Sequence, residues 1–484
     1  MGRAHADRRG VSTAAPQNAI AFGHAQTGAS TPGRPIRASS YRGFAGLTAD
    51  RVEWALITIE KRDRELGQTA RLVADILTAG GGEEAICQAS LQTFLWSELP
   101  RKFDPDEWIR IVRGATALLD ELDLHRYALL AGSVITHQVL RAWQESPRRG
   151  WTAYRKAAEA SGVLPPDTND FEWGTAMGLS EVRAFGRVEV ELERALTSRE
   201  LLPGGPRWKP KQRTVTEDVL RGPDPDRPER TLLDAIRQER VGSWVGLARP
   251  EQLQAWRAEI AETIGEPEPM ADPEPAVRAL RWFLALARGG VHLTQAGYLP
   301  PASVREAAEL FGWWEWPEPP RTEADVHQFE VLRELASRLR LVAKRGHHLM
   351  TTASGLALLD DPEALWRLIA PEIGCQDEFH AMLTELLAHR LLHGPVAGSE
   401  LETSLLPIVE AQGWRTRREA HPTFFSWEIY EPWRQFRTFW LIDVDDPPWA
   451  TGEHAGQQVT TLSPIGRATA IRFLRSMATG PQKL

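Results

Sequence analysis

The spacing of apolar residues changes twice in the C-terminal half of the sequence, and few folds can accommodate that change. Between residues 276 and 340 the spacing is mainly helical, interrupted by strand-like Val291-His292-Leu293 after a Gly-Gly pair. The run from Leu341 to Thr351 then has two short apolar arms about Gly346, which is typical of a β-hairpin. The order predicted over 276–370 is therefore helix (277–288), strand, helix (301–311), helix (323–340) and hairpin.

This order of elements resembles the winged-helix superfamily. The resemblance implies that helix 323–340, with Thr322 as its N-cap, is the recognition helix and that Lys344 to His348 form the wing. The apolar stripe of that helix leaves five side chains outward: His327, Glu330, Glu334, Ser337 and Arg338. The stretch from Gly289 to Trp313 also resembles segments of actinobacterial proteins of unassigned function, some related to insertion-element or plasmid passenger proteins. That second resemblance implies no activity.

A weaker copy of the same pattern follows in residues 371–484. Helical spacing is expected over 377–393 and 400–412 and in an aromatic helix from Pro432 to Trp440, with strands over 441–444 and 457–462. A hydroxyl residue followed three positions later by Gly recurs after apolar strands: Thr294 to Gly297, Thr352 to Gly355 and Ser463 to Gly466. The hydroxyl can cap a helix, and the Gly permits close backbone approach.

The remaining chain is expected to be helical. Residues 1–45 lack apolar periodicity and are expected to be a disordered tail, and Pro-rich 265–275 is the predicted linker after a helical domain over 46–264. Helices are predicted over 68–78, 84–97, 105–122, 125–145, 151–161, 180–199, 230–238 and 250–263, the last two packing onto the N-terminal domain. The fold class is mainly α: a helical N-terminal domain followed by one or two winged-helix-like units, 276–370 and 371–484.

Two basic stretches are candidate nucleic-acid contacts, because Lys and Arg neutralise phosphates. The first lies at the predicted wing and comprises Arg338, Arg340, Lys344, Arg345, His347 and His348. The second surrounds Trp208 and comprises Arg207, Lys209, Lys211 and Arg213, which could hold a phosphate beside a stacked base. A charged linker entering the next helix is the simpler explanation of the second stretch.

Charge limits how such a surface could work. The formal net charge is -8, and residues 276–370 carry equal numbers of basic and acidic side chains, so any positive surface must be local. Glu330 and Glu334 on the predicted recognition helix would repel phosphates. Three functions therefore stay open: a non-catalytic nucleic-acid-associated or regulatory protein that binds duplex DNA, a protein-interaction scaffold, and an unfamiliar enzyme with a site between domains.

Motifs of the common enzyme classes are missing from the sequence. It contains no GxSxG, no HExxH and no phosphate loop ending in Gly-Lys-Ser/Thr, so no catalytic residue, metal or cofactor is assigned. Cys87 and Cys375 stand alone, without ligand spacing or a disulfide framework. With no long apolar run or signal peptide, we expect a cytoplasmic protein that does not enter a membrane, and the excess of Arg over Lys suggests a bacterial genome.

Overall fold

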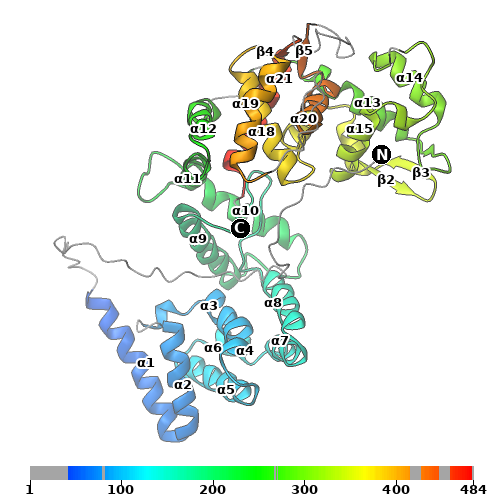
Figure 1. Ribbon diagram of the computed structural model, residues 1–484. Helices are drawn as coiled ribbons and strands as arrows, with labels where there is room; N and C mark the ends of the chain where they lie inside the picture. Colours follow the sequence, from blue (N-terminus) through cyan, green and yellow to red (C-terminus); the bar gives the residue numbers. More distant parts are fainter. Residues whose placement is uncertain are drawn as a thin grey trace. The chain divides into compact units, whose positions relative to one another are not determined.

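The structure is a computed structural model that describes residues 42–78, 82–265, 269, 271–314, 316–414, 427–445 and 458–481. It is mainly helical, with two small antiparallel sheets of three strands each, which confirms the predicted fold class (Figure 1). Most of the predicted tail, residues 1–41, lies outside the described residues, whereas residues 42–45 belong to the first helix. None of the described helices is long and apolar enough to cross a membrane.

The chain divides into two compact units between Ile236 and Arg237. The first is here called the helical unit. Its described α-helices, in chain order, are α1 (Arg42–Arg62), α2 (Arg64–Thr78), α3 (Gln88–Thr93), α4 (Leu99–Lys102), α5 (Pro105–Glu121), α6 (His125–Ala131), α7 (Val134–Glu145), α8 (Pro147–Ser161), α9 (Leu179–Thr197) and α10 (Trp208–Arg221). Helix α11 (Leu232–Gly246) spans the division.

Local capping explains where helices of the helical unit begin. The predicted helix 125–145 is two helices, because the Ser133 hydroxyl accepts a hydrogen bond from the Thr136 backbone and starts α7 after Gly132. Ser146 caps α8 in the same way, with Pro147 at the first helical position. Helix α2 packs against α1 and α5, and α7 packs against α8, so the apolar stripes face one another.

The second unit, here called the C-terminal unit, repeats one order of elements. The first copy consists of α13 (Glu274–Ala287), β1 (Val291–His292), α14 (Pro301–Phe311), α15 (Gln328–Arg338), β2 (Val342–Arg345) and β3 (His348–Thr351). The second copy consists of α18 (Glu378–Leu392), β4 (Val396–Ala397), α19 (Gly398–Ala411), α20 (Trp427–Thr438), β5 (Ile442–Val444) and β6 (Val459–Leu462). Helices α16 (Ala353–Leu358) and α17 (Pro362–Ile369) follow the first copy, and α21 (Pro464–Thr479) follows the second.

The sheets of the two copies correspond in order and in register. The strand orders are β1-β3-β2 and β4-β6-β5, all antiparallel. In the first sheet Val342 pairs with Thr351, and in the second Ile442 pairs with Leu462 at the equivalent place. Each paired residue of one sheet therefore has an equivalent residue in the other sheet. Features common to both copies can thus be distinguished from features of one copy.

The same helix start follows both hairpins. The Thr352 hydroxyl accepts a hydrogen bond from the Gly355 backbone at 3.1 Å, and the Ser463 hydroxyl accepts one from Gly466 at 3.0 Å. A Cβ atom on either glycine would overlap the carbonyl oxygen of Leu341 or Leu441. The predicted roles of hydroxyl and glycine are therefore confirmed at these two places. The prediction was wrong at Thr294, which starts a turn, with Gly297 at φ 86°, and no helix.

Several predicted boundaries differ from the structure. The linker 265–275 does not separate the units, because α12 (Glu251–Ile264) packs against α18 and α21, and Trp244, Leu253 and Ile264 lie in the core of the C-terminal unit. Arg257 of α12 also forms a two-pronged ion pair with buried Glu385 of α18, at 2.6 and 2.9 Å. Segments 276–370 and 371–484 share this one apolar core, so they are not separate domains.

Candidate nucleic-acid interface

The β2–β3 hairpin holds the basic residues predicted for the wing. Its strands are joined by a two-residue turn, and Gly346 takes a left-handed conformation at φ 59° that glycine adopts without strain. Lys344, Arg345, His347 and His348 are all exposed at this end of the sheet. We call these four residues together with His292 of β1 the wing surface, which includes both faces of this end of the sheet, because Lys344 pairs with Leu349 and Arg345 pairs with His348.

Pairing across the sheet brings side chains from three strands into one row. Arg345 of β2 lies opposite His348 of β3, and His348 lies opposite His292 of β1. Directly paired residues of antiparallel strands point to the same face, so the three side chains are neighbours. The backbone amide of Leu293 donates to the carbonyl of His347 at 2.7 Å and holds the turn against the end of β1.

The chain segments around the wing surface contain no carboxylate. Neither 288–305 nor 338–359, which together build the sheet and its turns, includes an Asp or Glu. Within the described part of the chain, Lys344 and Arg345 form no ion pair. The positive charge of these two side chains is therefore available to an external anion.

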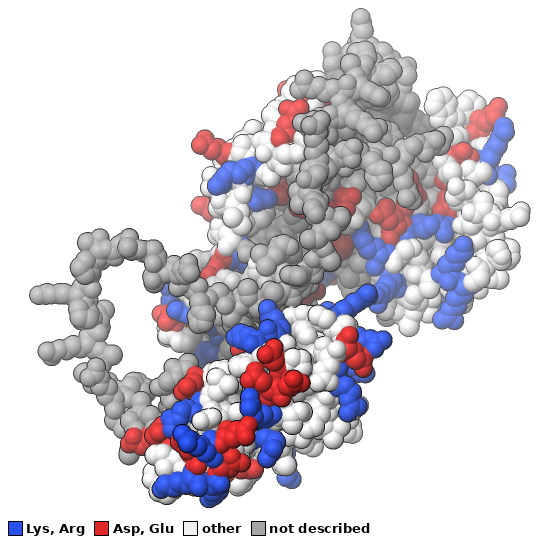
Figure 2. All heavy atoms as spheres, turned by 60° about the horizontal axis from the view of Figure 1, so that its bottom comes forward, with Lys and Arg blue, Asp and Glu red and all other residues white. Residues whose placement is uncertain are grey.

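The Lys and Arg side chains of the helical unit differ from Lys344 and Arg345 in their ion pairing. Many are paired with carboxylates on neighbouring helices, such as Arg71 with Glu53 at 2.9 Å and Arg110 with Glu65 at 3.0 Å. Figure 2 shows Lys and Arg mixed with Asp and Glu over the part of this unit that faces the viewer. Exposed pairs of this kind leave little net field for a polyanion.

Two predicted site residues lie away from the wing surface. Arg338, at the end of α15, donates to the backbone carbonyl of Glu372 and lies 3.6 Å from that residue's carboxylate. Arg340 is exposed but occupies the base of the hairpin, where its carbonyl accepts a hydrogen bond from Thr352 at 2.8 Å. Arg338 is thus used within the fold, and Arg340 is at the opposite end of the strands from His348.

The predicted recognition helix is shorter and less accessible than expected. Thr322 forms a capping box with Asp325, but it caps a 3-10 turn over Glu323–Asp325, and α15 itself begins at Gln328. Helix α15 packs against α20, its counterpart in the second copy, and Arg434 of α20 lies 3.8 Å from Glu330. Burial beside Arg434 and Arg437 lowers the pKa of His327 to about 3. The expectation that His327 faces outward was wrong.

The second copy lacks the basic character of the wing surface. The positions equivalent to Lys344 and Arg345 are Val444 and Asp445, and those equivalent to His292, His347 and His348 are Ala397, Gln458 and Val459. The same fold therefore carries a basic edge in one copy and a partly acidic edge in the other. The basic residues are not a requirement of the fold.

The second predicted basic stretch belongs to the helical unit. Arg207 precedes α10, and Lys209, Lys211 and Arg213 are exposed in its first turns, so the segment is helical and not a linker. Trp208 packs against a small apolar cluster of α9 and α10, with the Lys209 ammonium 5.8 Å from its ring. Because its ring is used in packing, Trp208 is a poor platform for a stacked base.

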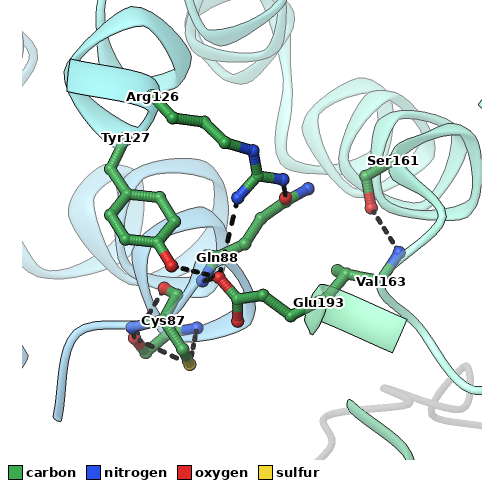
Figure 3. A network of polar contacts seen from close by, with 8 residues as sticks. Cys87, Gln88, Arg126, Tyr127, Ser161, Val163 and Glu193 are labelled. Atoms are coloured by element: carbon green, nitrogen blue, oxygen red, sulfur yellow. Dashed lines mark hydrogen bonds and ion pairs between the residues drawn. The ribbon is translucent and has the colours of Figure 1, made fainter. Parts of the chain in front are cut away.

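A polar network in the helical unit is the main alternative site (Figure 3). The Glu193 carboxylate of α9 accepts hydrogen bonds from the Gln88 backbone at 2.8 Å and from the Tyr127 hydroxyl, and it lies 3.7 Å from Arg126. These contacts join α9 to the starts of α3 and α6. The carboxylate is occupied in holding the fold together, so we assign the network a structural role.

Other candidates are also explained by the fold. Buried His389 stacks between Trp244 and Trp256, and burial and Arg257 lower its pKa to about 3. A hollow of about 360 Å³ between α2, α5 and α7 has mainly apolar walls. Among the described residues, no three His, Cys, Asp or Glu side chains are arranged to hold a metal ion.

Sequence reasoning missed His292, because two residues of strand give no sign of which strand they will join. Among the described residues, Trp54 of the helical unit and Trp316 of the C-terminal unit are exposed. In comparisons with known proteins, no family model, curated protein or solved structure matches the chain.

Proposed function

We propose that the chain binds nucleic acid non-catalytically through the wing surface, as a winged-helix-like module that contacts the phosphate backbone. The observation that carries the proposal is that Lys344 and Arg345 are exposed, unpaired within the described chain, and built on two segments free of carboxylates. Phosphate neutralisation by such side chains supplies most of the non-specific affinity of nucleic-acid-binding proteins.

The copy comparison supports this proposal over a purely structural role. Shared features, such as the Thr352 and Ser463 helix caps, recur in both copies because the fold needs them. The basic residues occur in one copy only, where Asp445 stands in place of Arg345 in the other. A role outside the fold explains why the two edges differ in charge.

The position of α15 supports binding without base readout. Direct readout requires an element that enters a groove and presents its side chains to base edges. Helix α15 packs against α20, and Glu330 and Glu334 lie on its remaining exposed side. The wing surface would therefore contact phosphates while α15 stays outside the major groove, and the affinity would depend little on sequence.

Binding of two duplexes with unrelated sequences tests the proposal. We expect the full chain to bind both with affinities within about threefold, since phosphate contacts carry no sequence information. The Lys344→Ala/Arg345→Ala variant should weaken both equally. A strong preference for one duplex would contradict backbone binding, and unchanged affinity in the variant would exclude the wing surface.

A further inference from the structure

The histidines of the wing surface come from three different places in the fold. His292 belongs to β1, His347 to the turn and His348 to β3. The rings of His292 and His348 are 5.0 Å apart and nearly perpendicular, and those of His292 and His347 are 6.2 Å apart and nearly parallel. Such a gathering of imidazoles beside Arg345 is not needed to close a hairpin.

The strands and turns that carry these histidines supply only cationic or neutral side chains, whereas the helices packed against the sheet, α13 and α15, also carry Glu274, Glu330 and Glu334. Strand β2 contributes Lys344 and Arg345, and strands β1 and β3 contribute no other titratable side chain. The loop after β1 contributes Tyr298, which is partly exposed, and Gly297, which lies close to the Lys344 ammonium. No carboxylate within 288–305 or 338–359 can stabilise an imidazolium.

Protonation of the histidines is therefore coupled to the binding of an anion. Positive charges on neighbouring rings repel one another, and Arg345 adds a further repulsion. A phosphate beside the row replaces this repulsion with attraction and accepts hydrogen bonds from the ring N–H groups. Because linkage is reciprocal, an anion that prefers the protonated rings must bind more tightly when protons are available.

From this geometry we infer that Arg345, His348, His292 and His347 form a phosphate-binding row whose imidazoles take up protons as the nucleic acid binds. The inference rests on the proposed function and adds His292 as a binding residue and proton uptake as a regulating step. The protons come from solvent, and the only bonds formed are the N–H bonds of the imidazolium rings. Affinity for a polyanion then rises as the pH falls through the range in which imidazole changes charge.

The second copy shows that the row is optional for the fold. Across β5, β6 and β4 the equivalent residues are Asp445, Val459 and Ala397, and they pair in the same register. A sheet of this size therefore forms without any histidine at these positions. Replacing the histidines of the first copy should leave the fold intact, so a change in binding can be read directly.

The test measures binding of the full chain to a labelled duplex of random sequence at fixed salt, at about pH 8 and about pH 6. We expect the wild-type affinity to rise about tenfold on acidification. His292→Gln and His347→Gln/His348→Gln should lose most of this gain on acidification, because the glutamine amide carries no charge at either pH. His137→Gln, an exposed histidine of the helical unit, is the matched control and should behave like wild type.

A second readout counts the protons. Calorimetric titration in two buffers of different ionisation enthalpy should show net proton uptake at about pH 6.5, reduced in His292→Gln. Binding at high pH that neither strengthens on acidification nor depends on the histidines would overturn the row and leave the proposed function standing. Absence of binding at both pH values would overturn both.

Discussion

Arg345 and Asp445 occupy equivalent positions in the two copies of the C-terminal unit but carry opposite charges. Each lies four residues after a leucine, Leu341 or Leu441, whose backbone amide bonds to the preceding helix. Arg345 pairs with His348, and the Asp445 amide donates to the Val459 carbonyl at 3.3 Å. Because both copies form the same sheet with opposite charges at this position, the fold does not require either charge.

Charge reversal at this position should affect binding in one copy only. Arg345→Asp places a carboxylate beside the phosphates and should weaken duplex binding by at least about tenfold, more than Arg345→Ala does. The matched change Asp445→Ala should leave affinity within about twofold. Fluorescence anisotropy with a random duplex measures both, and a gain in Asp445→Ala as large as the loss in Arg345→Ala would show that net charge, and not the wing surface, governs binding.

The Arg257–Glu385 ion pair should be important for the stability of the C-terminal unit. Both side chains are largely buried, and Arg257 also lies over the Trp244 ring and donates to its carbonyl. Glu385→Ala leaves a buried guanidinium without its partner and should lower the free energy of unfolding by roughly 3–5 kcal/mol.

Urea unfolding measures this loss, with Glu363→Ala as the control. Glu363 forms an exposed pair with Arg367 one turn away, and its removal should cost less than about 1 kcal/mol. A similar small loss in Glu385→Ala would mean that α12 does not depend on this contact for its place in the unit.

Gly466 should not tolerate even one added methyl group. A Cβ atom there would overlap the Leu441 carbonyl oxygen, which cannot move without disturbing the β5–β6 sheet. We expect Gly466→Ala to lower stability by about 1–3 kcal/mol. In Gly242→Ala, the added methyl group on α11 would extend into open space, and the variant should have a free energy of unfolding higher by about 0.5–1 kcal/mol. Thermal melts of both variants check the pair, and destabilisation by Gly242→Ala instead would contradict the packing described.

The helical unit should lose stability as the pH rises through neutrality because of Glu189. Burial, with the nearby Glu193 carboxylate, raises the pKa of Glu189 to about 7 from an ordinary value of 4.5. The folded chain thus holds this proton where the unfolded chain releases it. The resulting stability is complete below about pH 4.5 and is lost as the pH rises through about 7, at up to about 1.4 kcal/mol per unit of pKa difference.

Glu189→Gln removes the titration and should raise the unfolding midpoint at about pH 8 more than at about pH 5. Glu159→Gln, on the exposed side of α8, is the control and should change neither. Equal effects of Glu189→Gln at both pH values would show that the Glu189 carboxyl has an ordinary pKa.

Local signals made much of the fold predictable. The change of spacing at Leu341 and the Gly346 turn predicted the hairpin, and the hydroxyl–glycine pairs at Thr352 and Ser463 predicted two helix starts. These features depend on neighbours in the chain, which a single sequence contains.

What could not be predicted depends on contacts between distant segments. Helix α12 contacts α18 through the Arg257–Glu385 pair, and α15 is covered by α20, both of which lie far along the chain. The row of the wing surface joins His292 to residues more than fifty positions later through strand pairing. Basic residues near the hairpin were identified from sequence, but Arg338 could not be separated from them without knowing that it contacts Glu372.

The salt dependence of duplex binding tests the central claim most directly. The logarithm of the binding constant falls with the logarithm of salt concentration by about 0.9 for each phosphate contact. Lys344→Ala/Arg345→Ala should therefore reduce the slope by about 2 relative to wild type. Lys209→Ala/Lys211→Ala removes the same charge from the helical unit and should leave the slope unchanged. An unchanged slope in the first variant, or the full reduction in the second, would contradict binding through the wing surface.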